Sequence, residues 1–314
     1  MTSSRVAVIA VGGNALIMDP EHQSAADQFR SVEGSMQGVV DLICDGWTVV
    51  LTHGNGPQVG LVLRRSELSA PEIPPLPMDY ADADTQGMLG YMFQRAMGNE
   101  LRRRGTPSRA VTVLTQVVVS VDDPAMVHPS KPVGSFLTQE QAEEIHARDG
   151  WSIAEDAGRG WRRVVPSPYP REIVEIEAIK TLVAAGHVVV ACGGGGIPVV
   201  REGDALCGTW AVIDKDLTAS LLARELKADL LAILTGVDRV ATGFGTPAQE
   251  WLDTVSAADL RAAHDVGEFP AGSMEPKVRA VLEFLDAGGP RAIITDKDHL
   301  VEAVAGRAGT TITP

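Results

Sequence analysis

Six short apolar runs, separated mostly by segments of helical periodicity, constrain the fold more than any other feature of this sequence. The runs are rich in Val, Ile, Leu and Ala and do not alternate with polar residues, which is typical of strands covered on both faces. They span residues 5–11, 47–52, 109–119, 186–192, 229–235 and 291–295. The helical segments span residues 28–45, 86–104, 172–185, 216–226 and 274–287. This alternation predicts an α/β fold on a mainly parallel sheet with right-handed crossovers.

One segment breaks the alternation. Residues 120–170 contain several prolines and no long apolar run. A stretch of about fifty residues is too long for an ordinary loop. We therefore predict a small inserted lid subdomain at about 125–170. A weaker boundary falls near residues 200–210, and a chain of 314 residues has room for about two domains.

Charge and motifs exclude several function classes. The chain has 27 basic and 41 acidic residues, a net charge of −14, which argues against broad binding to nucleic acid or anionic membranes. It contains no P-loop, no dinucleotide fingerprint after the first run, no nucleophile elbow and no zinc-protease helix. The histidines are scattered, so we expect no protein-built metal site. His53 lies beside a glycine loop and either faces a ligand or bonds to backbone.

Cysteine usage and the N-terminus indicate a cytoplasmic protein. Cys44, Cys192 and Cys207 are odd in number and form no C-x-x-C pair, so we expect small buried side chains in a reducing compartment. The apolar run at residues 6–11 is too short for a membrane span. It also lacks the longer apolar region and cleavage site of a signal peptide.

Glycines gather where the apolar runs end. The clusters are Gly12-Gly13-Asn14, Gly54-Asn55-Gly56, the four glycines at 193–196, and Gly236. Open α/β sheets bind ligands at the carboxyl ends of their strands. Successive backbone N–H groups there can bind phosphate or carboxylate without net positive charge. The alternative for any one cluster is that its glycines only turn the chain.

Three lysines add positive charge at distinctive places. Lys215 and Lys277 stand at the starts of predicted helices, and Lys131 lies in the predicted lid. A lysine at a helix N-terminus opposes the helix dipole unless an anion joins it. The alternative is a solvated lysine paired with a neighbouring aspartate. Phosphoryl transfer needs alignment and positive charge around the moving group, so glycine loops with these lysines indicate a kinase without a P-loop.

At these residues the sequence resembles the amino acid kinase family, and within it the branch that transfers a phosphoryl group between ATP and carbamate. The shared motifs occur in the family's order over nearly the whole chain, and those of the lid are the most specific. They are residues 12–16 (GGNAL), 52–60 (THGNGPQVG), 85–91 (TQGMLGY), 131–134 (KPVG), 156–168 (DAGRGWRRVVPSP), 193–198 (GGGGIP), 212–216 (VIDKD), 234–238 (LTGVD) and 272–277 (GSMEPK).

The resemblance implies a three-layer αβα open sandwich around a mainly parallel sheet of about eight strands. Residues 1–205, with the lid inserted, would form a lobe for carbamate or carbamoyl phosphate, and residues 206–314 a lobe for the nucleotide. The implied reaction is reversible transfer between ATP plus carbamate and ADP plus carbamoyl phosphate. It also implies Mg²⁺ bound mainly through the nucleotide phosphates, a homodimer, and a role in ATP recovery during arginine breakdown.

The resemblance further assigns roles residue by residue. Lys215 and Lys277 would neutralise the phosphoryl oxygens, Asp216 would orient them, and Lys131 would reach in from the lid. The residues implied for the transferring phosphoryl group and the carbamate end are Gly12, Gly13, Asn14, Gly54 and Asn55. Those implied for the nucleotide are Gly236, Val237, Asp238, Met274 and Pro276.

One segment departs from the family pattern. Residues 78–84 are more acidic than family members usually are there. Asp82 and Asp84 either repel an anionic substrate or face solvent, and we expect them to face solvent. Two other functions stay open. One is transfer to a different acceptor: an amino-acid side-chain carboxylate, a phosphonate or a nucleoside monophosphate. The other is a catalytically silent sensor of nucleotide or carbamoyl phosphate.

Overall fold

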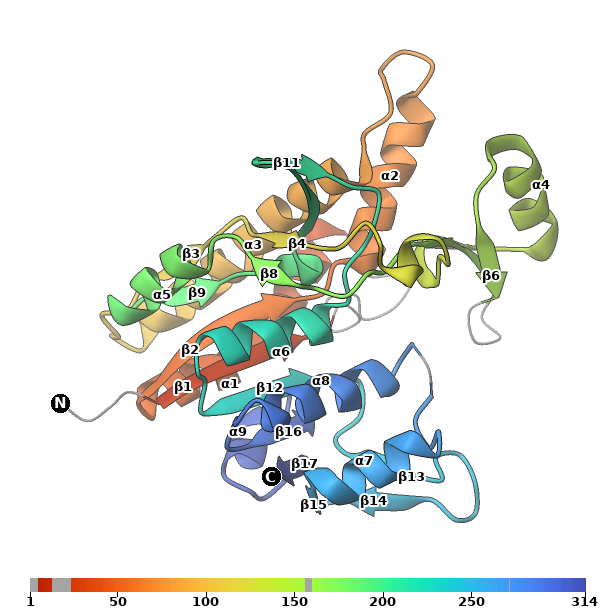
Figure 1. Ribbon diagram of the computed structural model, residues 1–314. Coiled ribbons are helices and arrows are strands. Elements are labelled where there is room, and N and C mark those ends of the chain that lie inside the picture. Colours follow the sequence, from red (N-terminus) through yellow and green to blue (C-terminus); the bar gives the residue numbers. More distant parts are fainter. Residues whose placement is uncertain (1–4, 13–23, 156–159, 271) are drawn as a thin grey trace.

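The computed structural model describes residues 5–12, 24–155, 160–270 and 272–314, and its centre is one large sheet (Figure 1). Eight strands lie in the order β15-β17-β16-β12-β1-β2-β9-β3. Their bounds are β1 (Arg5–Val11), β2 (Trp47–His53), β3 (Ala110–Thr112), β9 (Val188–Val190), β12 (Leu230–Leu234), β15 (Thr254–Ser256), β16 (Ala292–Thr295) and β17 (Thr310–Thr313). All neighbouring pairs are parallel except β16 and β17. The prediction of a mainly parallel sheet is confirmed.

Helices cover both faces of this sheet, and β1 shows why. Ala7, Ile9 and Val11 pack into one core, whereas Val8 and Ala10 pack into the other, since side chains alternate along a strand. The first core is closed by α1 (Ala25–Cys44), α3 (Met78–Arg103) and α9 (Leu300–Val304). The second is closed by α5 (Ile176–Ala184), α6 (Lys215–Glu225), α7 (Ala257–Asp265) and α8 (Glu275–Asp286). The expected three-layer αβα architecture is therefore confirmed.

The apolar run at 109–119 forms two strands that belong to different sheets, whereas the sequence predicts a single strand there. Its first part is β3, and its second part is β4 (Gln116–Val118). Between them the Gln86 side chain holds the backbone of Thr115: Oε1 accepts from the Thr115 N–H at 2.8 Å and Nε2 donates to its carbonyl at 3.0 Å. The second sheet has the order β11-β10-β4-β8, with β8 (Glu172–Ile173), β10 (Ile197–Glu202) and β11 (Ala205–Gly208).

The inserted segment forms a small sheet of its own. Its strands β5 (Lys131–Leu137), β7 (Trp161–Val165) and β6 (Ile153–Glu155) follow the short helix η2 (Pro124–Met126), and α4 (Gln139–Asp149) lies between β5 and β6 in the chain. In Figure 1, α4 and β6 project to one side of the main body. Backbone contact at β5 joins this inserted segment to α2 (Gly56–Ser69).

The contact between α2 and the lid depends on Gly60. A Cβ at Gly60 would lie 2.3 Å from the Cα of Gly134, which itself has φ +79°. We expect Gly60→Ala to lower the free energy of unfolding by about 1–3 kcal/mol, because backbone has to move. Gly87, on α3, has no atom within 4 Å of its Cβ position. The control Gly87→Ala should raise stability by about 0.5–1 kcal/mol through helix propensity. Urea unfolding of both variants checks this, and equal midpoints would contradict it.

The remaining described elements lie outside these sheets and helical layers. β13 (Val240–Thr242) and β14 (Glu250–Leu252) pair as a separate two-stranded sheet, and η3 (Gly193–Gly195) follows β9. Cys192 is buried as predicted, but Cys44 is exposed and Cys207 is half-buried, so the expectation of three buried cysteines is wrong for two of them. Among the described helices, none combines the length and apolar character needed to span a membrane.

Candidate active site

The carboxyl ends of the central strands gather several of the predicted site residues. Val11 lies opposite His53 in the β1–β2 ladder, and the Gly54 N–H donates to the Val11 carbonyl at 3.0 Å. On the other side of β1, a Cβ at Gly12 would lie 3.2 Å from the Leu234 carbonyl oxygen. Gly12, Gly54, Asn55 and Gly236 therefore follow three adjacent strands at one edge. Gly13 and Asn14 lie outside the described residues.

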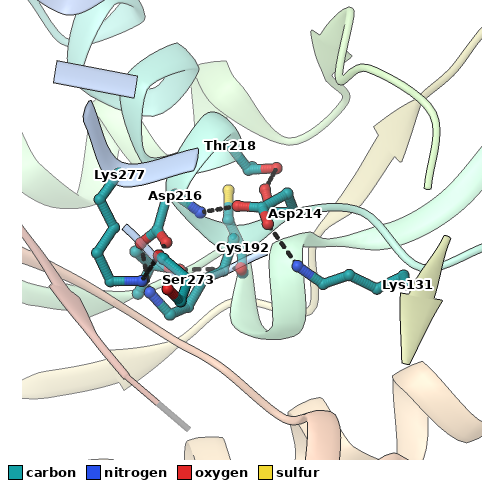
Figure 2. Close-up of polar contacts among 9 residues, drawn as sticks. Lys131, Cys192, Asp214, Asp216, Thr218, Ser273 and Lys277 are labelled. Carbon is teal, nitrogen blue, oxygen red and sulfur yellow. Dashed lines mark hydrogen bonds and ion pairs between the residues drawn. The ribbon is translucent and has the colours of Figure 1, made fainter. Parts of the chain in front are cut away.

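Two helix starts bring the lysines Lys215 and Lys277 onto one carboxylate. Lys215 is the first residue of α6, and Lys277 lies in the first turn of α8. The Lys215 ammonium donates to Oδ1 of Asp216, and Nζ of Lys277 donates to Oδ2 at 3.1 Å. Lys277 also donates to the Ser273 carbonyl at 2.9 Å (Figure 2). Asp216 thus joins two helices that are far apart in the sequence.

Burial shapes the charges of this cluster. Burial alone raises the pKa of the Asp216 carboxyl, but the ammonium groups of Lys215 and Lys277 outweigh it and hold that pKa well below its ordinary value. Burial lowers the pKa of Lys215, and the charge of Lys277 acts in the same direction, against the attraction of Asp216. Both lysine side chains are only 14% exposed. Two ammonium groups that are close together and poorly solvated favour the binding of an anion between them.

Lys131 reaches the same place from β5 of the inserted segment. Its ammonium pairs with Oδ2 of Asp214, whose Oδ1 accepts the Asp216 N–H at 2.8 Å and so caps α6. Burial opposes the charge of Lys131, but Asp214 outweighs it and raises the pKa of that lysine. In Figure 2, Lys131 approaches Asp214 from β5, while Lys277 approaches Asp216 from α8. Three ammonium groups face two carboxylates here, so positive charge is in excess.

Sequence reasoning gave Asp214 no role, although a signal for it was present. Aspartate directly before a helix is a preferred N-cap because its oxygen accepts a first-turn N–H. Here the cap leaves its second oxygen for Lys131, so a single residue fixes both the start of α6 and the position of the lid lysine.

Asp82 is buried, which overturns the expectation that it faces solvent. Its side chain is in the interior at 1% exposure, whereas Asp84 is exposed as expected. Oδ1 of Asp82 accepts from Nδ2 of Asn55 at 2.9 Å, and Oγ1 of Thr85 accepts from the same amide at 2.8 Å. The physical reason is that α3 begins at Met78 and turns Asp82 inward, onto the face that carries Thr85.

The glycines at 193–196 allow close packing and do not form an open ligand loop. All four are buried. A Cβ at Gly194 would lie 2.2 Å from Nδ2 of Asn55, and one at Gly195 would lie 2.4 Å from the Ile213 carbonyl oxygen. Gln86 donates to the Gly193 carbonyl at 2.9 Å, and Thr218 of α6 donates to the Gly195 carbonyl at 2.9 Å. This turn therefore connects the Asn55 loop to the start of the lysine-bearing helix α6.

His53 is a structural side chain within this packing. It is 1% exposed, its ring stacks on Phe93 with centroids 5.1 Å apart, and Nδ1 lies 3.2 Å from the Gly54 carbonyl oxygen. Of the two alternatives for His53, the structure shows the contact with backbone and not a ring that faces a ligand.

The burial of His53 predicts a pH-dependent stability. Burial lowers its pKa from 6.5 to about 4, against the Gly54 carbonyl. The unfolded chain therefore takes up the proton first, and the stability contributed by neutral His53 is lost as pH falls from 6.5 to 4. We expect a loss of about 3 kcal/mol from this residue, which His53→Gln should abolish. Burial raises the pKa of Asp82, so protonation of Asp82 increases stability as pH falls, opposite to the effect of His53. The quantity to compare is therefore the difference in free energy of unfolding between wild type and His53→Gln at each pH. Urea unfolding at several pH values measures it, and parallel curves would contradict it.

The residues expected around the nucleotide lie at two places in the C-terminal half. Gly236, Val237 and Asp238 follow β12, and Gly236 is exposed with no atom within 4 Å of its Cβ position. Met274 precedes α8, and Pro276 lies in its first turn, directly before Lys277. The part of the chain described here contains no group of three His, Cys, Asp or Glu side chains placed to hold a metal ion.

Comparisons with known proteins agree with this geometry. The model of the amino acid kinase family matches residues 5–296. A carbamate kinase of Pyrococcus horikoshii is 46% identical, over 98% of this chain and 98% of its own. The carbamate kinase-like protein YahI of Escherichia coli is 47% identical, over 97% of this chain and 98% of its own. The solved structure of carbamate kinase from Giardia lamblia bound to AMP-PNP has a TM-score of 0.92 and 41% identity, covering 100% of this chain and 99% of that one.

Proposed function

Because the chain belongs to the amino acid kinase family, we propose that it is a carbamate kinase, which transfers a phosphoryl group reversibly between ATP and carbamate. Relatives of this name match over nearly the whole chain at 46% identity. The observation that carries the proposal is the cluster in which Lys215 and Lys277 share Asp216 while Lys131 pairs with Asp214. Such a cluster offers concentrated positive charge to a phosphoryl group.

The transfer itself requires little from the protein beyond position and charge. An oxygen of carbamate attacks the γ-phosphorus of ATP, the bond to the bridging oxygen breaks, and ADP leaves with the bonding electrons. Negative charge then spreads over the transferring oxygens, and fixed cations stabilise it. Lys215 and Lys277 would stabilise this charge, with Asp216 orienting both, and Lys131 would contribute from the lid. Carbamate already carries an oxyanion, so no general base is needed.

Backbone groups would hold the acceptor side. Gly12, with Gly13 and Asn14, would bind the transferring phosphoryl group, and Gly54 and Asn55 the carbamate end. The N-terminus of α2 supports this assignment, because its N-cap residue Asn55 makes no side-chain cap. Pro57 has no N–H, but the N–H groups of Gly56 and Gln58 in the first turn of that helix receive no cap from the Asn55 side chain and can bind an anion.

The nucleotide would bind to the C-terminal lobe, residues 206–314, against the acceptor lobe of residues 1–205 with its inserted lid. Gly236, Val237, Asp238, Met274 and Pro276 would flank it. Support comes from their positions, at the end of β12 and at the start of the helix that carries Lys277. The related Giardia enzyme has been solved with AMP-PNP, an ATP analogue.

Mg²⁺ would enter with the nucleotide, as part of the substrate. The carboxylates of the lysine cluster, Asp214 and Asp216, are both engaged by ammonium groups. This set of side chains fits a metal held through phosphate oxygens and not through a protein cage. Bound there, such an ion would supply positive charge to the phosphates. We also propose a cytoplasmic homodimer that works towards ATP in arginine catabolism.

A panel of acceptors tests the identity of the substrate. The protein is incubated with MgATP and, separately, carbamate, acetate, glutamate, a phosphonate or a nucleoside monophosphate, and products are followed by phosphorus NMR. We expect a phosphorylated product with carbamate. Faster transfer to another acceptor would overturn the substrate, while tight nucleotide binding without any transfer would support a silent sensor.

A further inference from the structure

The amide of Asn55 is held in one orientation by two residues of α3. The Thr85 hydroxyl donates to the Asp82 backbone carbonyl at 2.8 Å, so Oγ1 of Thr85 can only accept from Asn55. Oδ1 of Asp82 accepts from the same Nδ2 at 2.9 Å. Both amide hydrogens of Asn55 are therefore directed at α3, and the nitrogen and oxygen positions of this amide are fixed by the network.

Gly194 closes another side of the amide. A Cβ at Gly194 would lie 2.2 Å from Nδ2, 2.5 Å from Cγ and 2.8 Å from Oδ1 of Asn55. The turn that carries Gly194 is itself held by Gln86, which donates to the Gly193 carbonyl at 2.9 Å. Packed in this way, the amide has no room to rotate. Its Oδ1 is a hydrogen-bond acceptor without a donor among the described residues.

We propose that Asp82 and Thr85 are positioning residues that present Oδ1 of Asn55 to the acceptor substrate, so that the site selects an acceptor bearing an N–H group. The inference rests on the proposed function, in which Asn55 holds the carbamate end. Carbamate and carbamoyl phosphate carry an NH₂ group that can donate to this oxygen. Acetate and acetyl phosphate have a methyl group at that place and leave the oxygen unpaired. A site built to bind an N–H discriminates against analogues that lack it.

The burial of Asp82 suits this role. Burial raises the pKa of its carboxyl well above the ordinary value; the Asn55 hydrogen bond opposes this, and the charge of Asp79 adds to it. Oδ2 of Asp82 has no hydrogen-bond partner among the described atoms. A neutral carboxyl still accepts through its carbonyl oxygen but does not repel an anionic substrate.

The test compares two phosphoryl donors to ADP. ATP formation from carbamoyl phosphate and from acetyl phosphate is measured with Mg²⁺, and the ratio of the two kcat/KM values is the readout. The variants are Asp82→Ala and Thr85→Val, each of which removes one acceptor from the Asn55 amide. Asp82→Asn keeps a carbonyl oxygen and is the conservative replacement. Asp84→Ala, at an exposed position on the same helix, is the matched control.

We expect wild type to prefer carbamoyl phosphate, and both Asp82→Ala and Thr85→Val to reduce that preference about tenfold, the effect of one lost hydrogen bond. Asp82→Asn and Asp84→Ala should keep the preference, and the KM for ADP should not change. Equal losses of kcat/KM with both donors would leave the ratio unchanged and would show that Asp82 only supports the fold. An unchanged ratio, with or without a loss of activity, would therefore overturn the inference. A wild type that uses both donors equally overturns the inference alone. One that uses neither overturns the proposed function, and the inference with it.

Discussion

Replacing Lys215 or Lys277 with alanine is expected to lower the rate of ATP formation by about two to three orders of magnitude. Each lysine donates to a different oxygen of Asp216, and each is only 14% exposed, so water replaces the lost charge poorly. Loss of one charged transition-state contact has an effect of about this size. Steady-state kinetics with ADP and carbamoyl phosphate measure it.

A lysine outside the cluster provides the control. Lys180 lies on α5 and pairs with Glu177 at 2.8 Å. Lys180→Ala should leave the rate within about twofold, because exposed ion pairs contribute little. Near-normal rates for Lys215→Ala and Lys277→Ala would show that the cluster takes no part in transfer.

Asp216→Ala is expected to cause the largest loss of stability, about 3–5 kcal/mol, the typical cost of removing one partner from a buried ion pair. The variant leaves the Lys215 and Lys277 ammonium groups facing each other without the carboxylate that joins them. Its turnover should fall at least as far as that of the lysine variants. Urea unfolding in a buffer without phosphate measures the stability.

Asp214→Ala gives a graded comparison. It removes the α6 cap and the partner of Lys131 but leaves the pairs at Asp216 in place. Its loss should be smaller, about 1–2 kcal/mol, as for other helix caps. Adding pyrophosphate should raise the free energy of unfolding of Asp216→Ala more than that of wild type, because the anion replaces the missing negative charge. Asp216→Ala within about 0.5 kcal/mol of wild type would contradict this, since changes of that size are typical of surface sites.

Local signals in the sequence predicted the mainly parallel sheet and the unusual placement of the lysines, whereas the family resemblance implied the three layers. The central strands are continuous apolar runs, and β1, β2 and β12 lie within one residue of the predicted bounds. Lys215 and Lys277 stand at helix starts, where an unpaired cation is unfavourable and indicates a partner. That partner is Asp216, which accepts from both lysines as the family resemblance implies.

The burial of Asp82 differs from the prediction because the helix begins earlier than the apolar pattern indicates. We predicted the helix from residue 86, whereas α3 begins at Met78, directly after Pro77. Extended back, the buried positions Met78, Ala81, Asp82, Thr85, Gln86 and Leu89 form one face at spacings of three and four. An acidic residue interrupts the apolar pattern of such a face, so the sequence does not indicate that Asp82 is buried. Its hydrogen-bond partner, Asn55, lies 27 positions away in the sequence.

The glycines at 193–196 show a second limit of sequence reasoning. Their position after an apolar run is the same as that of Gly12 and Gly54. What separates them is contact with Asn55 and Ile213, which come from other parts of the chain. Close packing and an open ligand loop require the same residue type, so only the three-dimensional arrangement distinguishes them.

The proposed activity is tested most directly by one assay. The purified protein is mixed with ADP, Mg²⁺ and carbamoyl phosphate, and ATP is followed continuously by a coupled reaction, with a Lys215→Ala/Lys277→Ala double variant run in parallel. We predict rapid ATP formation by wild type and a rate at least a hundredfold lower in the double variant. Absence of ATP formation by a folded wild-type protein would contradict the proposed function, and equal rates in both proteins would contradict the assigned site.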